Sequence, residues 1–146
     1  MGASRSKLVW TGRVISVLLS LLFTMSAVMK LTGGGGVKEG MAHLGLPESL
    51  IIPLGILELS CVVIYLIPAT SIVGAILLTG YIGGAILAHL RVGDPFFIQI
   101  VLGICVWLGL YLRDKRLRDL IPLRTSMAVD YSGSPSTKLE HAGLEH

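Results

Sequence analysis

Polar residues lie inside the long apolar stretches of this sequence, and four of them are Lys30, Glu58, His89 and Gln99. An ionisable group at membrane depth is costly, so it indicates a functional site and requires a partner. Glu58 is the clearest case, because it lies about eight residues from one end of the stretch 50–68 and about ten from the other. Its short side chain reaches neither end. A carboxylate, an ammonium group and an imidazole together can bind a polar head group or relay a proton.

The depth of each residue follows from its distance to the end of its stretch, at ~1.5 Å per helical residue. Lys30 lies at the outer end of the first stretch, His89 lies about one turn from the end of the third, and Gln99 lies one turn into the fourth. We therefore expect the four polar residues to converge in the outer half of a helix bundle. Arg91 and Asp94 lie just beyond, where they could close the pocket.

Two interpretations of this predicted cluster are open. In the structural one, Glu58 pairs with Lys30 or is protonated, and the cluster fixes the register of the helices. In the functional one, the cluster binds the head of a small amphipathic molecule such as a quinone, or relays protons through His89. No catalytic residue is assigned. We expect no metal site, because the four histidines lack ligand spacing.

Composition indicates a membrane protein. The chain has 146 residues, of which 53% are hydrophobic and 14% charged, whereas soluble domains carry about 25% charged residues. The mean hydropathy is +0.78. The sequence predicts an all-α integral membrane protein, a four-helix transmembrane bundle, because four apolar stretches each have the length needed to cross ~30 Å of hydrocarbon. These predicted spans are residues 14–32, 50–68, 71–92 and 96–112.

Basic residues gather on one side of the predicted spans, in residues 1–13 and 113–124. The positive-inside rule therefore predicts that the N- and C-termini are cytoplasmic. We expect 1–13 to be a basic cytoplasmic N-terminus, 113–124 a basic interfacial segment, and 125–146 a disordered cytoplasmic tail.

The sequence also limits cofactors and partners. The net charge is +3, but the basic residues are placed by membrane side and not along one exposed stripe, so we expect no nucleic-acid partner. Cys61 and Cys105 form neither a CxxC motif nor a disulfide framework, and there is no haem, flavin or metal motif. A quinone is the cofactor considered. Membrane lipids and other membrane subunits, or a homo-oligomer, are the expected partners, in the bacterial inner (cytoplasmic) membrane.

Two sets of small residues recur every four positions, a spacing that lets membrane helices pack closely. The sets are Gly80, Gly84 and Ala88 in the third predicted span and Ser16, Ser20 and Thr24 in the first. We expect them to be helix-packing residues. Tyr65, near the cytoplasmic end of the second span, is expected to be an interfacial anchor.

Several short strings carry a family resemblance: Met29-Lys30-Leu31, LGILEL at 54–59, GGAILAHL at 83–90, and the turn Gly93-Asp94-Pro95. With these, residues 13–124 resemble the DoxX-like family of small four-span membrane proteins. The resemblance implies association with membrane redox machinery. Relatives are linked to the small subunit of a thiosulfate:quinone oxidoreductase, to complexes that handle oxidative stress, and to chaperone-like roles. Thiosulfate oxidation is not carried over, because no exposed catalytic cysteine is evident.

The first hypothesis is therefore an accessory or anchoring subunit of a membrane complex, in redox or electron transfer, with a quinone- or lipid-binding polar cavity. Such a subunit is not itself an enzyme. The alternatives are a stand-alone membrane oxidoreductase acting on quinone or a sulfur compound, and a small transporter. Transport is disfavoured, because four spans without a detectable repeat are few for alternating access.

Overall fold

The computed structural model describes residues 2–120, and every regular element in this part of the chain is helical. The elements are α1 (Gly2–Thr32), α2 (Val37–His43), the 3₁₀ turn η1 (Glu48–Leu50), α3 (Ile51–Leu66), α4 (Ser71–Val92), α5 (Phe97–Arg113) and α6 (Lys115–Leu120). The predicted all-α class is confirmed. The tail predicted for 125–146 lies outside the described residues.

Three segments are long and apolar enough to cross a membrane: Ser6–Thr32, Glu48–Leu66 and Ser71–Val92. The fourth, α5, is an apolar helix of 17 residues, which is at the lower end of the spanning range. Large apolar side chains cover the outside of the bundle, among them Leu21 (62% exposed) and Leu87 (68% exposed). Because that surface would be unfavourable in water, the chain is an integral membrane protein with a four-helix bundle.

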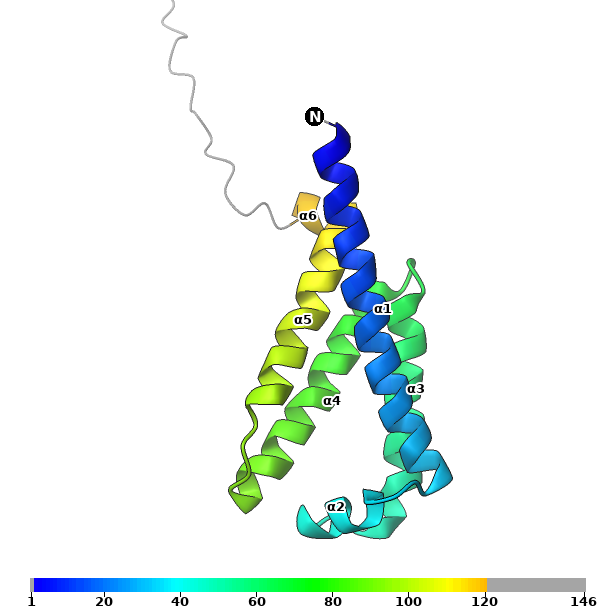
Figure 1. Cartoon of the computed structure of the whole chain (residues 1–146), viewed down its shortest axis with the longest axis vertical. Helices are drawn as coiled ribbons and strands as arrows, with labels where there is room; N and C mark the ends of the chain where they lie inside the picture. The colour runs from blue at the N-terminus through cyan, green and yellow to red at the C-terminus, as the bar shows by residue number, and fades with distance from the viewer. Residues whose placement is uncertain (1, 121–146) are drawn as a thin grey trace, which may run out of the picture.

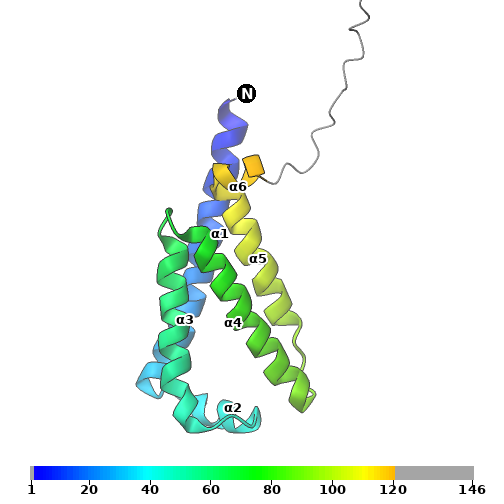
Figure 2. The ribbon, with the colours of Figure 1, turned by 180° about the vertical axis from the view of Figure 1, so that it is seen from behind.

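The four long helices form a closed ring in which α1 and α4 each pack against both α3 and α5. Figure 1 and the reverse view in Figure 2 show that the α1–α3 pair and the α4–α5 pair diverge toward the end of the bundle where α2 lies. The beginning of α1 and the short α6 lie at the opposite end. The helix pairs are therefore closest near the α6 end.

Close helix contacts occur at glycines other than the predicted ones. A β-carbon on Gly74 of α4 would lie 2.3 Å from the backbone of Tyr65 in α3, and one on Gly109 of α5 would lie 2.9 Å from Ser16 Oγ. Gly80 and Gly84, by contrast, would meet nothing within 4 Å. Ala88 lies one turn further along the same helix and is half-buried. Within one chain, the glycine stripe of α4 therefore lies on the exposed face.

The serine set of α1 lies inside the bundle. Ser16 is 0% and Ser20 5% exposed, and Thr24 is half-buried. Ser16 Oγ lies 3.1 Å from the Tyr65 hydroxyl, which donates a hydrogen bond of 2.9 Å to the carbonyl of Val106 in α5. One tyrosine thus connects α1, α3 and α5.

The interfacial role expected for Tyr65 is wrong, because this side chain is 0% exposed. Arg113 of α5 lies over the Tyr65 ring, with its Cζ 4.5 Å from the ring centroid, and also donates to the Tyr65 carbonyl. The guanidinium therefore covers the tyrosine from the end of the bundle. Position near a span end did not reveal this, because the burial of Tyr65 depends on its contacts with α1 and α5.

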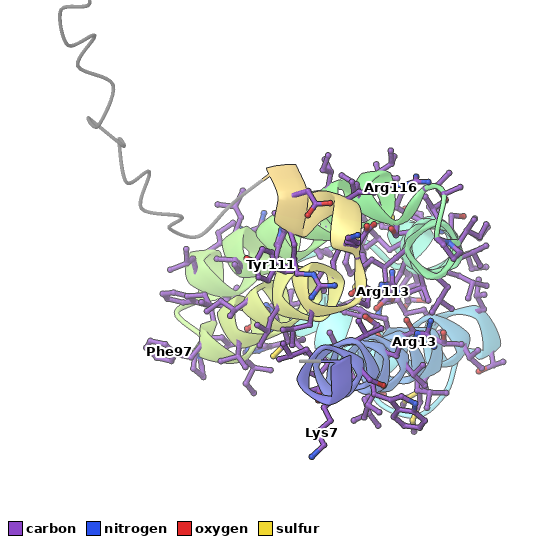
Figure 3. All side chains as sticks on the ribbon, turned by 90° about the horizontal axis from the view of Figure 1, so that it is seen from above. Lys7, Arg13, Phe97, Tyr111, Arg113 and Arg116 are labelled. Atoms are coloured by element: carbon purple, nitrogen blue, oxygen red, sulfur yellow. The ribbon has the colours of Figure 1, made fainter. Side chains whose placement is uncertain are left out.

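The first helix begins at Gly2, twelve residues before the predicted span. Its 31 residues extend about 46 Å, so its first turns project beyond the apolar layer. No proline interrupts them, which explains why the helix continues through the basic N-terminal segment. Figure 3 shows Lys7 on this projecting part, pointing away from the bundle.

Candidate functional site

The site begins where α1 and α3 touch, at Gly55. A β-carbon on Gly55 would lie 3.1 Å from the β-carbon of Lys30 and 3.2 Å from the carbonyl oxygen of Ala27. Ala27 itself is 0% exposed. Glycine at position 55 therefore brings the backbone of α1 close to α3, so the long Lys30 side chain can reach a residue one turn further along α3.

That residue is Glu58. Lys30 Nζ donates to Glu58 Oε2 at 2.9 Å, and the two side chains are 17% and 2% exposed. Ser26, one turn before Lys30 on α1, completes the group: Lys30 Nζ donates to Ser26 Oγ at 2.6 Å, and Ser26 Oγ donates to Glu58 Oε2 at 3.3 Å. Three polar groups thus satisfy one another inside an apolar bundle, as buried charges must.

A cavity of about 370 Å³ adjoins the ion pair. Ser26 and Lys30 line it from α1, while Gly36, Gly40 and Met41 line it from the segment that contains α2. An ammonium group carries three N–H donors, and two of those on Lys30 are used by Ser26 and Glu58. The third is available to a hydrogen-bond acceptor in the cavity.

Arg91 and Asp94 hold in place the α2 segment, which lines one side of this open cavity. One Arg91 nitrogen donates to the carbonyls of Leu44 at 2.7 Å and Gly45 at 3.1 Å. The imidazole of His43, at the end of α2, lies 2.9 Å from Asp94 Oδ2. Both residues therefore act through α2, which crosses the end of the bundle in Figures 1 and 2.

His89 and Gln99 form a separate pair between α4 and α5. The His89 Nδ1 atom lies 2.8 Å from the Ala85 carbonyl, and Gln99 Nε2 lies 3.2 Å from His89 Nε2. Within residues 2–120, no hydrogen bond or ion pair links these two to Lys30 or Glu58. The structure therefore arranges the four polar residues as two pairs, one on each of the diverging helix pairs, and not as one cluster.

Three residues of the site were not selected from the sequence. Ser26 could have been found, because it lies four residues before Lys30 and so shares its helix face. His43 lies outside the predicted spans; its side chain is 62% exposed and pairs with Asp94. Tyr81 of α4 lies next to Glu58, a neighbour that depends on how α4 is rotated about its axis.

The fold and the site together define a class of protein: a small membrane bundle of four helices with a buried, hydrogen-bonded ion pair beside an open cavity. The sequence model of the DoxX-like family matches residues 14–110, which is more than half of the chain. The chain belongs to the DoxX-like family. Searches of curated proteins and of solved structures gave no match.

Proposed function

We propose that this protein binds the polar head of a small amphipathic molecule in the cavity beside Lys30. The observation that carries the proposal is the position of Lys30, whose ammonium group contacts Ser26 and Glu58 and whose residue lines the cavity. A group built only to fix helix register would not need an adjoining cavity of about 370 Å³. Ligand sites commonly combine such a volume with a few polar groups.

The charge of the site favours a neutral acceptor as the head group. Glu58 already neutralises Lys30, so a carboxylate or phosphate in the cavity would add an uncompensated charge at membrane depth. A carbonyl oxygen, by contrast, can accept the third ammonium N–H without changing the net charge. A quinone has such carbonyls and an apolar tail, so it is the head group we propose.

Lysine, glutamate and serine side chains hold and polarise a carbonyl group but do not carry electrons. In this proposal the electron acceptor is the bound quinone, and a partner subunit delivers the electrons. The protein is then an accessory or anchoring subunit of a membrane redox complex, with both termini on the cytoplasmic side. Membership in the DoxX-like family is compatible with this role.

Binding is tested with decylubiquinone and the full chain in lipid nanodiscs, by isothermal titration. The double variant Lys30→Met/Glu58→Leu removes both charges together and leaves neither one unpaired. We expect it to weaken binding at least ten-fold. The matched control is Lys38→Met/Glu48→Leu, which removes an ion pair of 3.0 Å whose side chains are 63% and 65% exposed. Equal binding by the site variant and the wild type would contradict the proposal.

The accessory role is tested separately, by extracting the protein from its native membrane in a mild detergent. A redox polypeptide that co-purifies in fixed ratio supports the subunit assignment. If the purified protein alone catalyses turnover of decylubiquinone, the stand-alone oxidoreductase replaces it. If reconstituted protein moves a solute across liposomes without partners, the transporter replaces it.

A further inference from the structure

A second cavity lies on the opposite helix pair. Between α4 and α5 an open groove of about 680 Å³ is lined mostly by apolar side chains, including Ile82, Ile86 and Ile104, and it ends at Leu117 of α6. Gln99 lines it near the beginning of α5. From Gln99 to Tyr111 the groove follows about 18 Å of helix. Its shape and lining fit an extended hydrocarbon chain.

The polar atoms in the middle of the groove have partners. Trp107 Nε1 donates to Thr79 Oγ1 at 2.9 Å, and Thr79 Oγ1 donates to the Ala75 carbonyl at 2.7 Å. At Gln99 the situation differs, because its Oε1 is shielded from water and has no hydrogen-bond partner among the described residues. Unpaired buried polar atoms are rare in proteins and call for an explanation.

The orientation of the Gln99 amide follows from the hydrogen bonds of His89. The Ala85 carbonyl can only accept, so the Nδ1 atom of His89 carries a hydrogen and donates to it. In a neutral imidazole the other nitrogen is then an acceptor. A neutral His89 therefore accepts a hydrogen bond from the Gln99 NH₂ group, whose Nε2 atom lies 3.2 Å from His89 Nε2. The amide oxygen is left for a different donor.

We propose that the groove between α4 and α5 binds an amphipathic molecule that has a single apolar chain and a hydroxyl head. The chain lies along the isoleucines and Trp107, and the hydroxyl donates a hydrogen bond to Gln99 Oε1 after a small rotation of the Gln99 side chain. A head group that only accepts hydrogen bonds, such as an ether, leaves the amide oxygen unpaired. This site is distinct from the cavity beside Lys30 and does not depend on its function.

The proposal is tested by photolabelling the full chain in phosphatidylcholine vesicles. The probes are a hexadecanol that carries a diazirine in its chain and the methyl ether of the same molecule, and mass spectrometry locates the labelled peptides. We expect the alcohol to label α4 and α5 roughly three- to five-fold more than the ether, the effect of one neutral hydrogen bond. Equal labelling by the two probes would overturn the role of Gln99.

Two variants separate the head group from the chain. Gln99→Leu removes the acceptor, so the alcohol and the ether should label equally. Gly83→Leu fills the groove, since Gly83 lines it and an added β-carbon meets nothing within 4 Å, and labelling by both probes should fall. Gly80→Leu is the matched control, because Gly80 is equally open and lies outside the groove lining. Unchanged labelling in Gly83→Leu, or retained preference for the alcohol in Gln99→Leu, would contradict the proposal.

Alkyl alcohols and alkylphenols share the proposed chemistry, and competition distinguishes them. Unlabelled hexadecanol and unlabelled pentadecylphenol are each added with the alcohol probe. The stronger competitor identifies the head group that the site prefers. If neither reduces labelling of α4 and α5, the groove is not a specific site.

Discussion

Gly55 and Lys30 lie in contact across the α1–α3 interface, where a β-carbon on Gly55 would lie 3.1 Å from the β-carbon of Lys30. Glu58, which forms an ion pair with Lys30, lies one helical turn after Gly55 in α3. Helix packing and the polar site are therefore coupled. A substitution that moves the backbones of α1 and α3 apart also lengthens the distance between the Lys30 ammonium group and the Glu58 carboxylate.

This coupling predicts the effect of Gly55→Leu. The larger side chain cannot fit against α1 without a shift of the backbone, and overpacking of this kind lowers the free energy of unfolding by about 1–3 kcal/mol. Binding of decylubiquinone should fall as well. Unfolding in mixed SDS micelles measures the first effect, with Gly80→Leu as the control, because that position has open space around it. Equal stability of the two variants would show that α1 and α3 are not in close contact.

The ion pair predicts a characteristic double-mutant cycle. Lys30→Met or Glu58→Leu alone leaves one buried charge without a partner, and each should lower the free energy of unfolding by about 3 kcal/mol. The double variant should lie within ~1 kcal/mol of the wild type, because no unpaired charge remains. The cycle is measured by SDS unfolding. Additive losses in the double variant would mean that the two side chains do not interact.

Tyr65 should contribute to stability through its hydroxyl group. Tyr65→Phe removes the hydrogen bond to Val106 and the contact with Ser16, and should lower the free energy of unfolding by about 1 kcal/mol. Once the hydroxyl is absent, Ser16→Ala should have a smaller effect than it has in the wild type. A full additional loss in the double variant would indicate that Ser16 has another role.

Arg91 should control how firmly α2 is held against the end of the bundle. Arg91→Met removes the hydrogen bonds to the Leu44 and Gly45 carbonyls, so α2 should open more often and its backbone amides should exchange hydrogen several-fold faster. Hydrogen exchange with mass spectrometry of residues 37–46 measures this rate. Lys38→Met is the control, since its ion pair is exposed and such pairs stabilise little. Equal exchange in the two variants would contradict the role of Arg91 in holding α2.

The sequence predicted the membrane helices from hydropathy, and residue depth offered pairing with Lys30 as one of the open interpretations of Glu58. It did not predict the separation of His89 and Gln99 from that pair. The distance of a residue from the end of its helix gives its position along the bundle axis but not its lateral position. The two helix pairs diverge toward the end of the bundle where α2 lies.

The sequence also did not predict how α4 is rotated about its own axis. Gly74, Gly80 and Gly84 lie on the same helix, yet a β-carbon on Gly74 would overlap the Tyr65 backbone, whereas one on Gly80 or Gly84 would meet no described atom within 4 Å. Which glycine of a helix faces inward depends on its neighbours, and these are set by the whole packing arrangement.

The central claim is that Lys30 donates a hydrogen bond to a carbonyl oxygen of the bound molecule. The most direct measurement is the infrared spectrum of decylubiquinone with ¹³C-labelled carbonyls, bound to the wild type and to Lys30→Met/Glu58→Leu. We predict that the carbonyl stretch moves to lower wavenumber in the wild type only. A carbonyl band identical in both proteins, at its position in lipid alone, would contradict the account.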